Sequence, residues 1–187
     1  MRKLILIKHA RPLVDPAKSS ELWTLSDQGR EQARALAGEL AAMQPAIVVS
    51  SEEPKAVETA QILAEELKLP IEQHADLREH DRRNVPHMRS GEFISHVELF
   101  FRRPDELNLG DETANEALDR FEEAVEGLLA KHSEGNVAIV SHGTVIALFI
   151  ARHSDRNGFQ VWREMSLPSF ALFELPGMKL QEIRKQG

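Results

Sequence analysis

The sequence predicts an α/β fold, a three-layer sandwich in which helices cover both faces of a mostly parallel sheet. Short apolar runs, each the length of a buried strand, alternate along the chain with longer stretches of helical periodicity. Three of these runs end in polar, potentially reactive side chains, as strands do at the ligand-binding edge of an open sheet. Alternation of strands and helices places a crossover helix after each parallel strand and so covers both faces.

Length and composition narrow the class of protein. The 187 residues predict a single domain over 1–187 with a full-sized hydrophobic core. The net charge of −7 argues against a broad nucleic-acid surface. The chain has no cysteine, which excludes disulfides, Cys-ligated zinc and thiol nucleophiles. The longest apolar stretch, Val137–Ile150, is interrupted by polar residues, so we expect no membrane contact and a cytoplasmic protein.

The first half of the chain predicts three strands and two helices. Ser26 has the character of a helix N-cap, and Pro54 suits the first turn of a helix. In order, we expect a strand at Leu4–Ile7, a loop at Leu13–Leu25, a helix from Ser26 to Leu40, a strand at Ala46–Val49, a helix from Pro54 to Leu67 and a short strand at Ile71–Leu77.

The second half opens with an irregular, highly charged excursion around 78–110. Long excursions of this kind are commonly lids or substrate contacts. We expect one helix inside it, at Glu92–Phe101, then a helix from Thr113 to Leu129, a strand at Val137–Val140, a helix at Val145–Arg152 and a final strand at Phe170–Leu175.

The three polar strand ends are Lys8-His9, Ser50-Ser51 and Ser141-His142. In parallel topology they meet at the same edge of the sheet, and the last two are each followed by the start of a helix. Free N–H groups and the positive dipole end of a helix suit an anion there. Two histidines from separate strands could then face one bound phosphate.

Five segments in this order resemble the histidine phosphatase superfamily, in the branch related to phosphoglycerate mutases. They are LIKHARP, LSDQGREQARALAGEL, VVSSEEPKAVETAQILAEEL, LREHD and VAIVSHGTVIA. The first resembles the family's nucleophile motif, the fourth its acid-bearing loop and the last its second histidine motif. The resemblance covers nearly the whole chain and implies the phosphoglycerate mutase-like fold.

The resemblance also implies a reaction and its residues. It implies hydrolysis of a small phosphorylated substrate through a phosphohistidine on His9, without a metal or other cofactor. His142 would donate to the phosphate, and Glu79 would protonate the leaving oxygen, with His80 and Asp81 as alternatives to Glu79. The residues expected to bind phosphate are Lys8, Arg11, Lys55 and Gly143.

Departures from the family pattern leave other functions open. Lys8 and Lys55 stand where the family has arginines, which keeps the charge but loses the planar, bidentate clamp. Ala10 replaces a glycine, and Asp15 replaces an asparagine common in mutases. One alternative is therefore a degenerate phosphatase that only binds a phosphorylated ligand, and another is a mutase-type phosphotransferase.

Several side chains of the excursion have no assigned role. Its basic residues are candidates for substrate contacts, as are the two tryptophans: His87, Arg82, Arg83, Arg89, Arg102, Arg103, Trp23 and Trp162. A histidine metal site is a further alternative, although the irregular spacing favours solvated loop residues: His74, His80, His87 and His96. The sequence predicts no oligomeric state.

Overall fold

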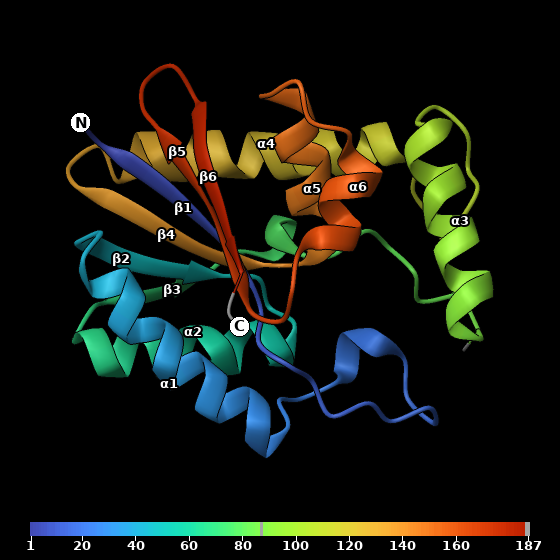
Figure 1. The fold of residues 1–187 in the computed structure, drawn as a ribbon, viewed down its shortest axis with the longest axis horizontal. Coiled ribbons are helices and arrows are strands. Elements are labelled where there is room, and N and C mark those ends of the chain that lie inside the picture. Colours follow the sequence, from blue (N-terminus) through green and yellow to red (C-terminus); the bar gives the residue numbers. More distant parts are fainter. Residues whose placement is uncertain (87, 186–187) are drawn as a thin grey trace.

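The computed structural model describes residues 1–86 and 88–185 (Figure 1). Its elements are β1 (Lys3–Lys8), the 3₁₀ turn η1 (Ser20–Leu22), α1 (Asp27–Ala41), β2 (Pro45–Ser50), α2 (Pro54–Leu67), β3 (Ile71–Gln73), the 3₁₀ turn η2 (Ala75–Leu77), α3 (Ser90–Arg102), α4 (Ala114–Lys131), β4 (Asn136–Ser141), α5 (Gly143–Arg152), α6 (Gly158–Glu164), β5 (Ser169–Glu174) and β6 (Lys179–Lys185).

The strands form one sheet in the order β3-β2-β4-β1-β5-β6. β3, β2, β4 and β1 are parallel to one another, whereas β5 pairs antiparallel with β1 and forms a hairpin with β6. The predicted three-layer α/β fold with a mostly parallel sheet is confirmed, and the antiparallel hairpin is confined to one edge.

Alternating side chains of the central strands bury the two faces of the sheet. Leu4 and Leu6 of β1 pack in a core with residues of α4 and α5, whereas Ile5 and Ile7 pack with residues of α1 and α2. All four side chains are fully buried. Because successive residues of a strand point to opposite faces, a continuous apolar run is what a sheet covered on both sides requires. Figure 1 shows α1 and α2 on one side of the sheet and α4 to α6 on the other.

The described structure corrects some of the predicted elements. The strand expected at Ile71–Leu77 ends at Gln73, because the ring of His74 accepts the amide of Asp76 and starts the turn η2. α6 and β6 were not predicted. α6 has only seven residues, and β6 is a highly charged edge strand, so neither shows a strong apolar pattern.

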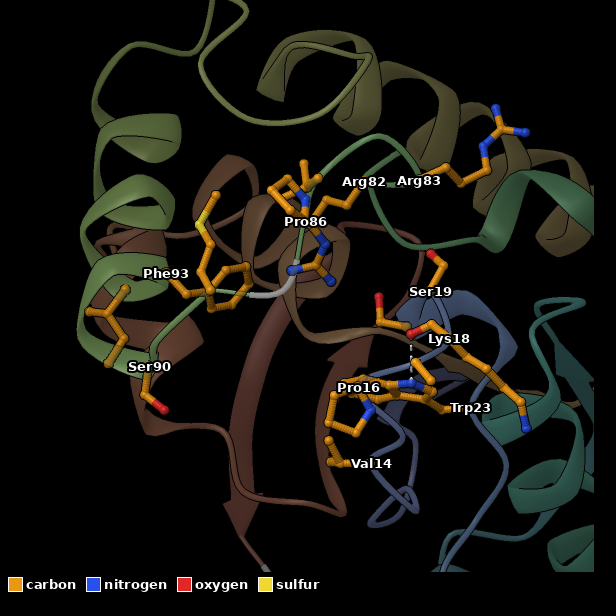
Figure 2. Close-up of a pocket in the computed structure, with 15 residues that line it drawn as sticks. Val14, Pro16, Lys18, Ser19, Trp23, Arg82, Arg83, Pro86, Ser90 and Phe93 are labelled. Carbon is orange, nitrogen blue, oxygen red and sulfur yellow. Dashed lines mark hydrogen bonds between the residues drawn. The ribbon is translucent and has the colours of Figure 1, made fainter.

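The excursion around 78–110 carries α3 beyond the carboxyl ends of the parallel strands (Figure 1). Its helix α3, which confirms the predicted helix with slightly wider bounds, contacts α6 through Phe93 and Trp162, whose ring centroids are 6.1 Å apart. A cavity of about 610 Å³ separates this segment from the chain before α1 (Figure 2). In the part of the chain that the structure describes, no helix has both the length and the apolar character needed to cross a membrane.

At Gly110, the backbone at the end of the excursion packs against the backbone of Asp81 near its start. Its φ is +81°, and a Cβ at this position would come within 1.9 Å of the Asp81 carbonyl oxygen. The same carbonyl accepts the amide of Asp111 at 2.8 Å. Only glycine fits this close crossing of two backbone segments.

Gly110→Ala should therefore lower the free energy of unfolding by at least about 2 kcal/mol, since it adds both backbone strain and a clash. Urea unfolding followed by circular dichroism measures the change. Gly127→Ala is the matched control, because Gly127 lies on the exposed face of α4 with nothing within 4 Å, so a gain of about 0.5–1 kcal/mol is expected. Equal stabilities of the Gly110 variant and the wild type would contradict this account.

Candidate active site

The ends of β1 and β4 bring two of the predicted histidines together. Lys8 pairs with Ser141 in the parallel ladder, and the amide of His9 donates to the Ser141 carbonyl at 3.0 Å. The next residue on each strand is a histidine, and the ring centroids of His9 and His142 are 5.3 Å apart with planes tilted by 59°. His142 is completely buried, and His9 is 7% exposed.

The tautomer of His9 follows from its hydrogen bond. Nδ1 lies 2.8 Å from the Ala10 carbonyl oxygen, which can only accept, so Nδ1–H donates. Nε2 therefore carries the free lone pair of a neutral imidazole. Burial, followed by the proximity of His142 and Lys55, holds the pKa of His9 well below its ordinary value.

His142 bridges the second and third strand ends. Its Nε2 lies 2.6 Å from the Ser51 hydroxyl and 3.4 Å from a carboxylate oxygen of Glu53. Its Nδ1 is buried and has no hydrogen-bond partner within residues 1–86 and 88–185. Burial, then nearby Lys55, lowers the pKa of His142 well below its usual range. His142 is also the residue that precedes α5, so its ring sits at the helix N-terminus.

Glu79 faces the same helix N-terminus. Its carboxylate accepts the amides of Thr144 at 3.1 Å and Val145 at 3.3 Å, and it pairs with Arg82 at 3.4 Å. Burial opposes ionisation, but Arg82, His142, His80 and the Thr144 amide together lower the pKa of Glu79 well below its ordinary value. The carboxyl is therefore ionised in the free protein.

The two alternatives to Glu79 point elsewhere. His80 stacks on Phe100, with ring centroids 4.4 Å apart, and donates from Nε2 to the Leu109 carbonyl at 3.2 Å. Asp81 pairs with the exposed Arg83. Of the three, Glu79 alone contacts the N-terminus of α5 in the described contacts.

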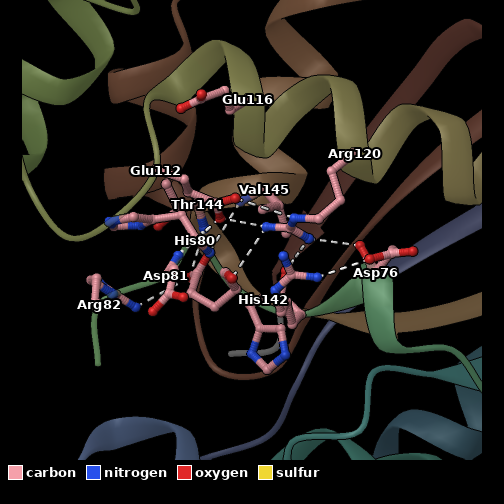
Figure 3. A network of polar contacts seen from close by, with 12 residues as sticks. Asp76, His80, Asp81, Arg82, Glu112, Glu116, Arg120, His142, Thr144 and Val145 are labelled. Atoms are coloured by element: carbon pink, nitrogen blue, oxygen red, sulfur yellow. Dashed lines mark hydrogen bonds and ion pairs between the residues drawn. The ribbon is translucent and has the colours of Figure 1, made fainter. Parts of the chain in front are cut away.

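A half-buried arginine of α4, Arg120, binds the backbone of the segment that carries Glu79; Figure 3 shows this arginine with Asp76 and Glu112. Arg120 donates to the carbonyls of Asp76 at 2.7 Å, Arg78 at 3.2 Å and Glu79 at 3.3 Å. It also pairs with Glu112 at 2.6 Å, and Glu112 in turn accepts the amide of Asp81. The sequence does not predict a role for Arg120. In the sequence it is one charged residue next to the apolar positions of a helix, as many surface residues are.

The expected phosphate-binding cations differ in their surroundings. Lys8 donates to the Met165 carbonyl at 2.9 Å and packs against Gly143, where a Cβ would come 3.0 Å from Lys8 Cε. Burial, only partly offset by Glu79, lowers the pKa of Lys8 to about 8. Arg11 is exposed, and its backbone carbonyl accepts hydrogen bonds from Ser26 at the start of α1.

Lys55 is already engaged by an acidic residue that the sequence reasoning did not consider. Its ammonium pairs with Glu53 at 2.5 Å and donates to the Ser20 carbonyl at 2.7 Å. The other oxygen of Glu53 accepts the amide of Glu79 at 2.8 Å and faces His142. The Glu53 carboxylate thus occupies Lys55, one of the three cations expected to bind phosphate, and faces His142.

Two of the histidines considered as a metal site, His74 and His80, have separate surroundings. His74 caps η2 and His80 packs on Phe100, while His87 lies outside the described residues. Within the described ranges, no three His, Asp or Glu side chains are grouped as a metal ion would require.

Because His80 is buried in its neutral form, the stability of the folded protein is expected to fall in acid. Burial lowers the pKa of His80 to about 3, so it stays neutral in the folded protein while the unfolded chain protonates it below about pH 6.5. The unfolded state then binds more protons, and stability falls as pH falls by up to about 1.4 kcal/mol per unit for each such group. His80→Gln should reduce this slope between pH 6 and 5 in urea unfolding. Above pH 7 the free energies of unfolding of variant and wild type should change with pH in the same way. An unchanged slope below pH 6 would contradict the claim that His80 stays neutral in the folded protein.

Comparison with known proteins identifies the family. Residues 5–176 match the model of the histidine phosphatase superfamily (branch 1). A glucosyl-3-phosphoglycerate phosphatase of Mycolicibacterium vanbaalenii is 29% identical over 171 residues, covering 81% of this chain and 73% of that protein. Among solved structures, mycobacterial hydrolase 1 has a TM-score of 0.82 at 21% identity, covering 100% of this chain and 99% of its own. Bacillus stearothermophilus YhfR has a TM-score of 0.77 at 24% identity, with 97% and 95% covered. The predicted family is confirmed: the chain belongs to the histidine phosphatase superfamily.

Proposed function

We propose that the protein hydrolyses phosphomonoesters through a phosphohistidine on His9, without a metal. The observation that carries this proposal is the hydrogen bond from His9 Nδ1 to the Ala10 carbonyl, which leaves the Nε2 lone pair free beside His142. A neutral imidazole held in one tautomer is what nucleophilic attack on phosphorus requires. The family assignment and the phosphatase relative support the same reaction.

In the first step the phosphate lies between His9 and the N-terminus of α5. Lys8, Lys55 and the side chain of His142 bind its oxygens, and Gly143, the first residue of α5, lies beside it. Nε2 of His9 forms a bond to phosphorus as the ester P–O bond breaks. The phosphate anion bound beside the Glu79 carboxylate raises its pKa, so Glu79 takes up a proton from the phosphate monoanion of the substrate and then gives that proton to the leaving oxygen.

In the second step water replaces the alcohol. Glu79, now a carboxylate, takes a proton from water, and the oxygen attacks the phosphohistidine. The P–N bond breaks, and inorganic phosphate leaves with His9 neutral again. We also propose that Arg11 acts only at the rim of the site, since its side chain is exposed.

The substrate that we propose is a small phosphorylated molecule rather than a nucleic acid. We also propose that residues 1–187 form a single domain. A role restricted to binding is less favoured, because a protein that only binds has no use for a nucleophilic tautomer. A mutase would have to protect its phosphohistidine from water, and nothing in the described site favours that reaction.

The central test is hydrolysis of 4-nitrophenyl phosphate by the purified protein with a chelator present. His9→Ala should lower kcat at least about 10³-fold, because the nucleophile is lost. Quenching the wild type with alkali during turnover should trap phosphate on histidine, and later acidification should release it. His132→Ala is the control, since His132 pairs with Glu72 at the opposite end of α4 from Thr113 and should leave the rate unchanged. Retained activity in the His9 variant would reject the mechanism.

A second prediction concerns the lysine that replaces an arginine. Lys8 is a cation below its pKa of about 8 and loses its charge above it, so kcat/KM should fall as pH rises past 8. Lys8→Arg stays charged and should move this alkaline limb up by at least about one pH unit. The measurement is the pH profile of kcat/KM from 6 to 10.

Lys131→Arg, a substitution on the exposed end of α4, is the control and should reproduce the wild-type profile. If the Lys8 variant also keeps the wild-type limb, Lys8 does not supply charge to the phosphate.

A further inference from the structure

The cavity beside the candidate active site has two apolar walls (Figure 2). One wall comes from the chain before α1 and contains Val14, Pro16 and Trp23. The facing wall comes from the excursion and contains Val85, Pro86, Met88, Phe93 and Ile94. The indole N–H of Trp23 donates to the Asp15 carbonyl at 3.0 Å, which fixes the loop that carries the first wall. A volume of about 610 Å³ suits a small organic group.

Two residues join this cavity to the proposed catalytic groups. Ser20 lines the cavity, and its carbonyl accepts Lys55 Nζ at 2.7 Å. Arg82 lines it as well, pairs with Glu79 at 3.4 Å and lies over the ring of Phe93, with Cζ 5.2 Å from the centroid. Glu79 is the proposed proton donor to the leaving oxygen. A group attached to that oxygen has a route along Arg82 into the cavity.

The charges of the cavity argue for an uncharged substituent. Among the described residues three cations line it, and each already faces a carboxylate: Lys18 with Asp15 at 3.2 Å, Arg82 with Glu79 at 3.4 Å and Arg83 with Asp81 at 2.5 Å. A second anion on the substrate would have to displace one of these carboxylates. An aromatic ring, in contrast, gains contact with both apolar walls and with the guanidinium face of Arg82.

We propose that the preferred substrates are phosphomonoesters of uncharged aromatic alcohols or phenols, whose ring lies between Trp23 and Phe93. This inference rests on the proposed phosphatase function, because it places the phosphate at His9. It names the substrate class that the walls of the cavity select.

The test compares esters that differ only in the group that enters the cavity. 2-Naphthyl phosphate and phenyl phosphate have leaving groups of similar acidity, so a difference in kcat/KM reports on the added ring. The wild type should prefer the naphthyl ester at least about tenfold. It should use 4-carboxyphenyl phosphate no better than phenyl phosphate.

Substitutions in the cavity walls test whether the preference for the naphthyl ester arises there. Phe93→Ala and Val14→Ser should both reduce the naphthyl-to-phenyl ratio to within about threefold of unity while hydrolysis of phenyl phosphate continues. Val14 is 54% exposed in a loop, so its replacement leaves the core intact even if Phe93→Ala loosens α3. Leu107→Ala is the matched control, because Leu107 is 63% exposed in the excursion and does not line the cavity, and it should keep the wild-type ratio.

Binding measurements separate this inference from the proposed function. Calorimetric titration with non-hydrolysable 2-naphthyl and phenyl phosphonates requires no turnover. Tighter binding of the naphthyl compound that is lost in Val14→Ser supports the aromatic pocket even if no ester is hydrolysed, in which case only the phosphatase proposal fails. Equal binding or no binding of the two phosphonates, a preference for the carboxyphenyl ester, or a naphthyl preference that every variant retains would overturn the inference.

Discussion

The candidate site depends on the parallel pairing of β1 with β4. The ladder ends with Lys8 opposite Ser141, and the amide of His9 continues it by donating to the Ser141 carbonyl. Parallel strands end at the same edge, so one more residue on each strand places His9 and His142 side by side. Both strands are buried on two faces, and neither histidine can move without disturbing the core. A shift of one strand by one residue would turn its histidine toward the opposite face of the sheet, away from the other histidine.

The sequence predicts the fold and the paired histidines for a simple physical reason. Both depend on apolar runs of strand length followed by polar residues, a local pattern that burial imposes directly. The edge strand β6 escapes this reasoning, since its alternation is dominated by charged side chains. Its place in the sheet is set by the hairpin with β5, a tertiary contact that a local pattern does not contain.

The surroundings of Glu79 are the least predictable part of the site. Glu79 can be identified from the LREHD segment, but its position in space depends on Arg120, which lies more than 40 residues later in the chain. Arg120 binds three backbone carbonyls, and carbonyls are present at every residue, so no sequence pattern marks its partners. Glu53 was missed for a similar reason, because its ion pair with Lys55 two residues away resembles an ordinary surface pair until the fold buries it.

The ion pair between Glu53 and Lys55 has a consequence for the release of inorganic phosphate in the proposed reaction. If phosphate binds Lys55 as proposed, the Glu53 carboxylate lies beside the cation when the phosphate leaves and pairs with it, so no unpaired ammonium is left buried. An internal anion at high effective concentration competes with the free product as well as with the substrate. In the proposed reaction, this competition weakens the retention of phosphate at Lys55. In this respect the lysine at position 55 differs from an arginine clamp, which would hold the departing phosphate through two hydrogen bonds.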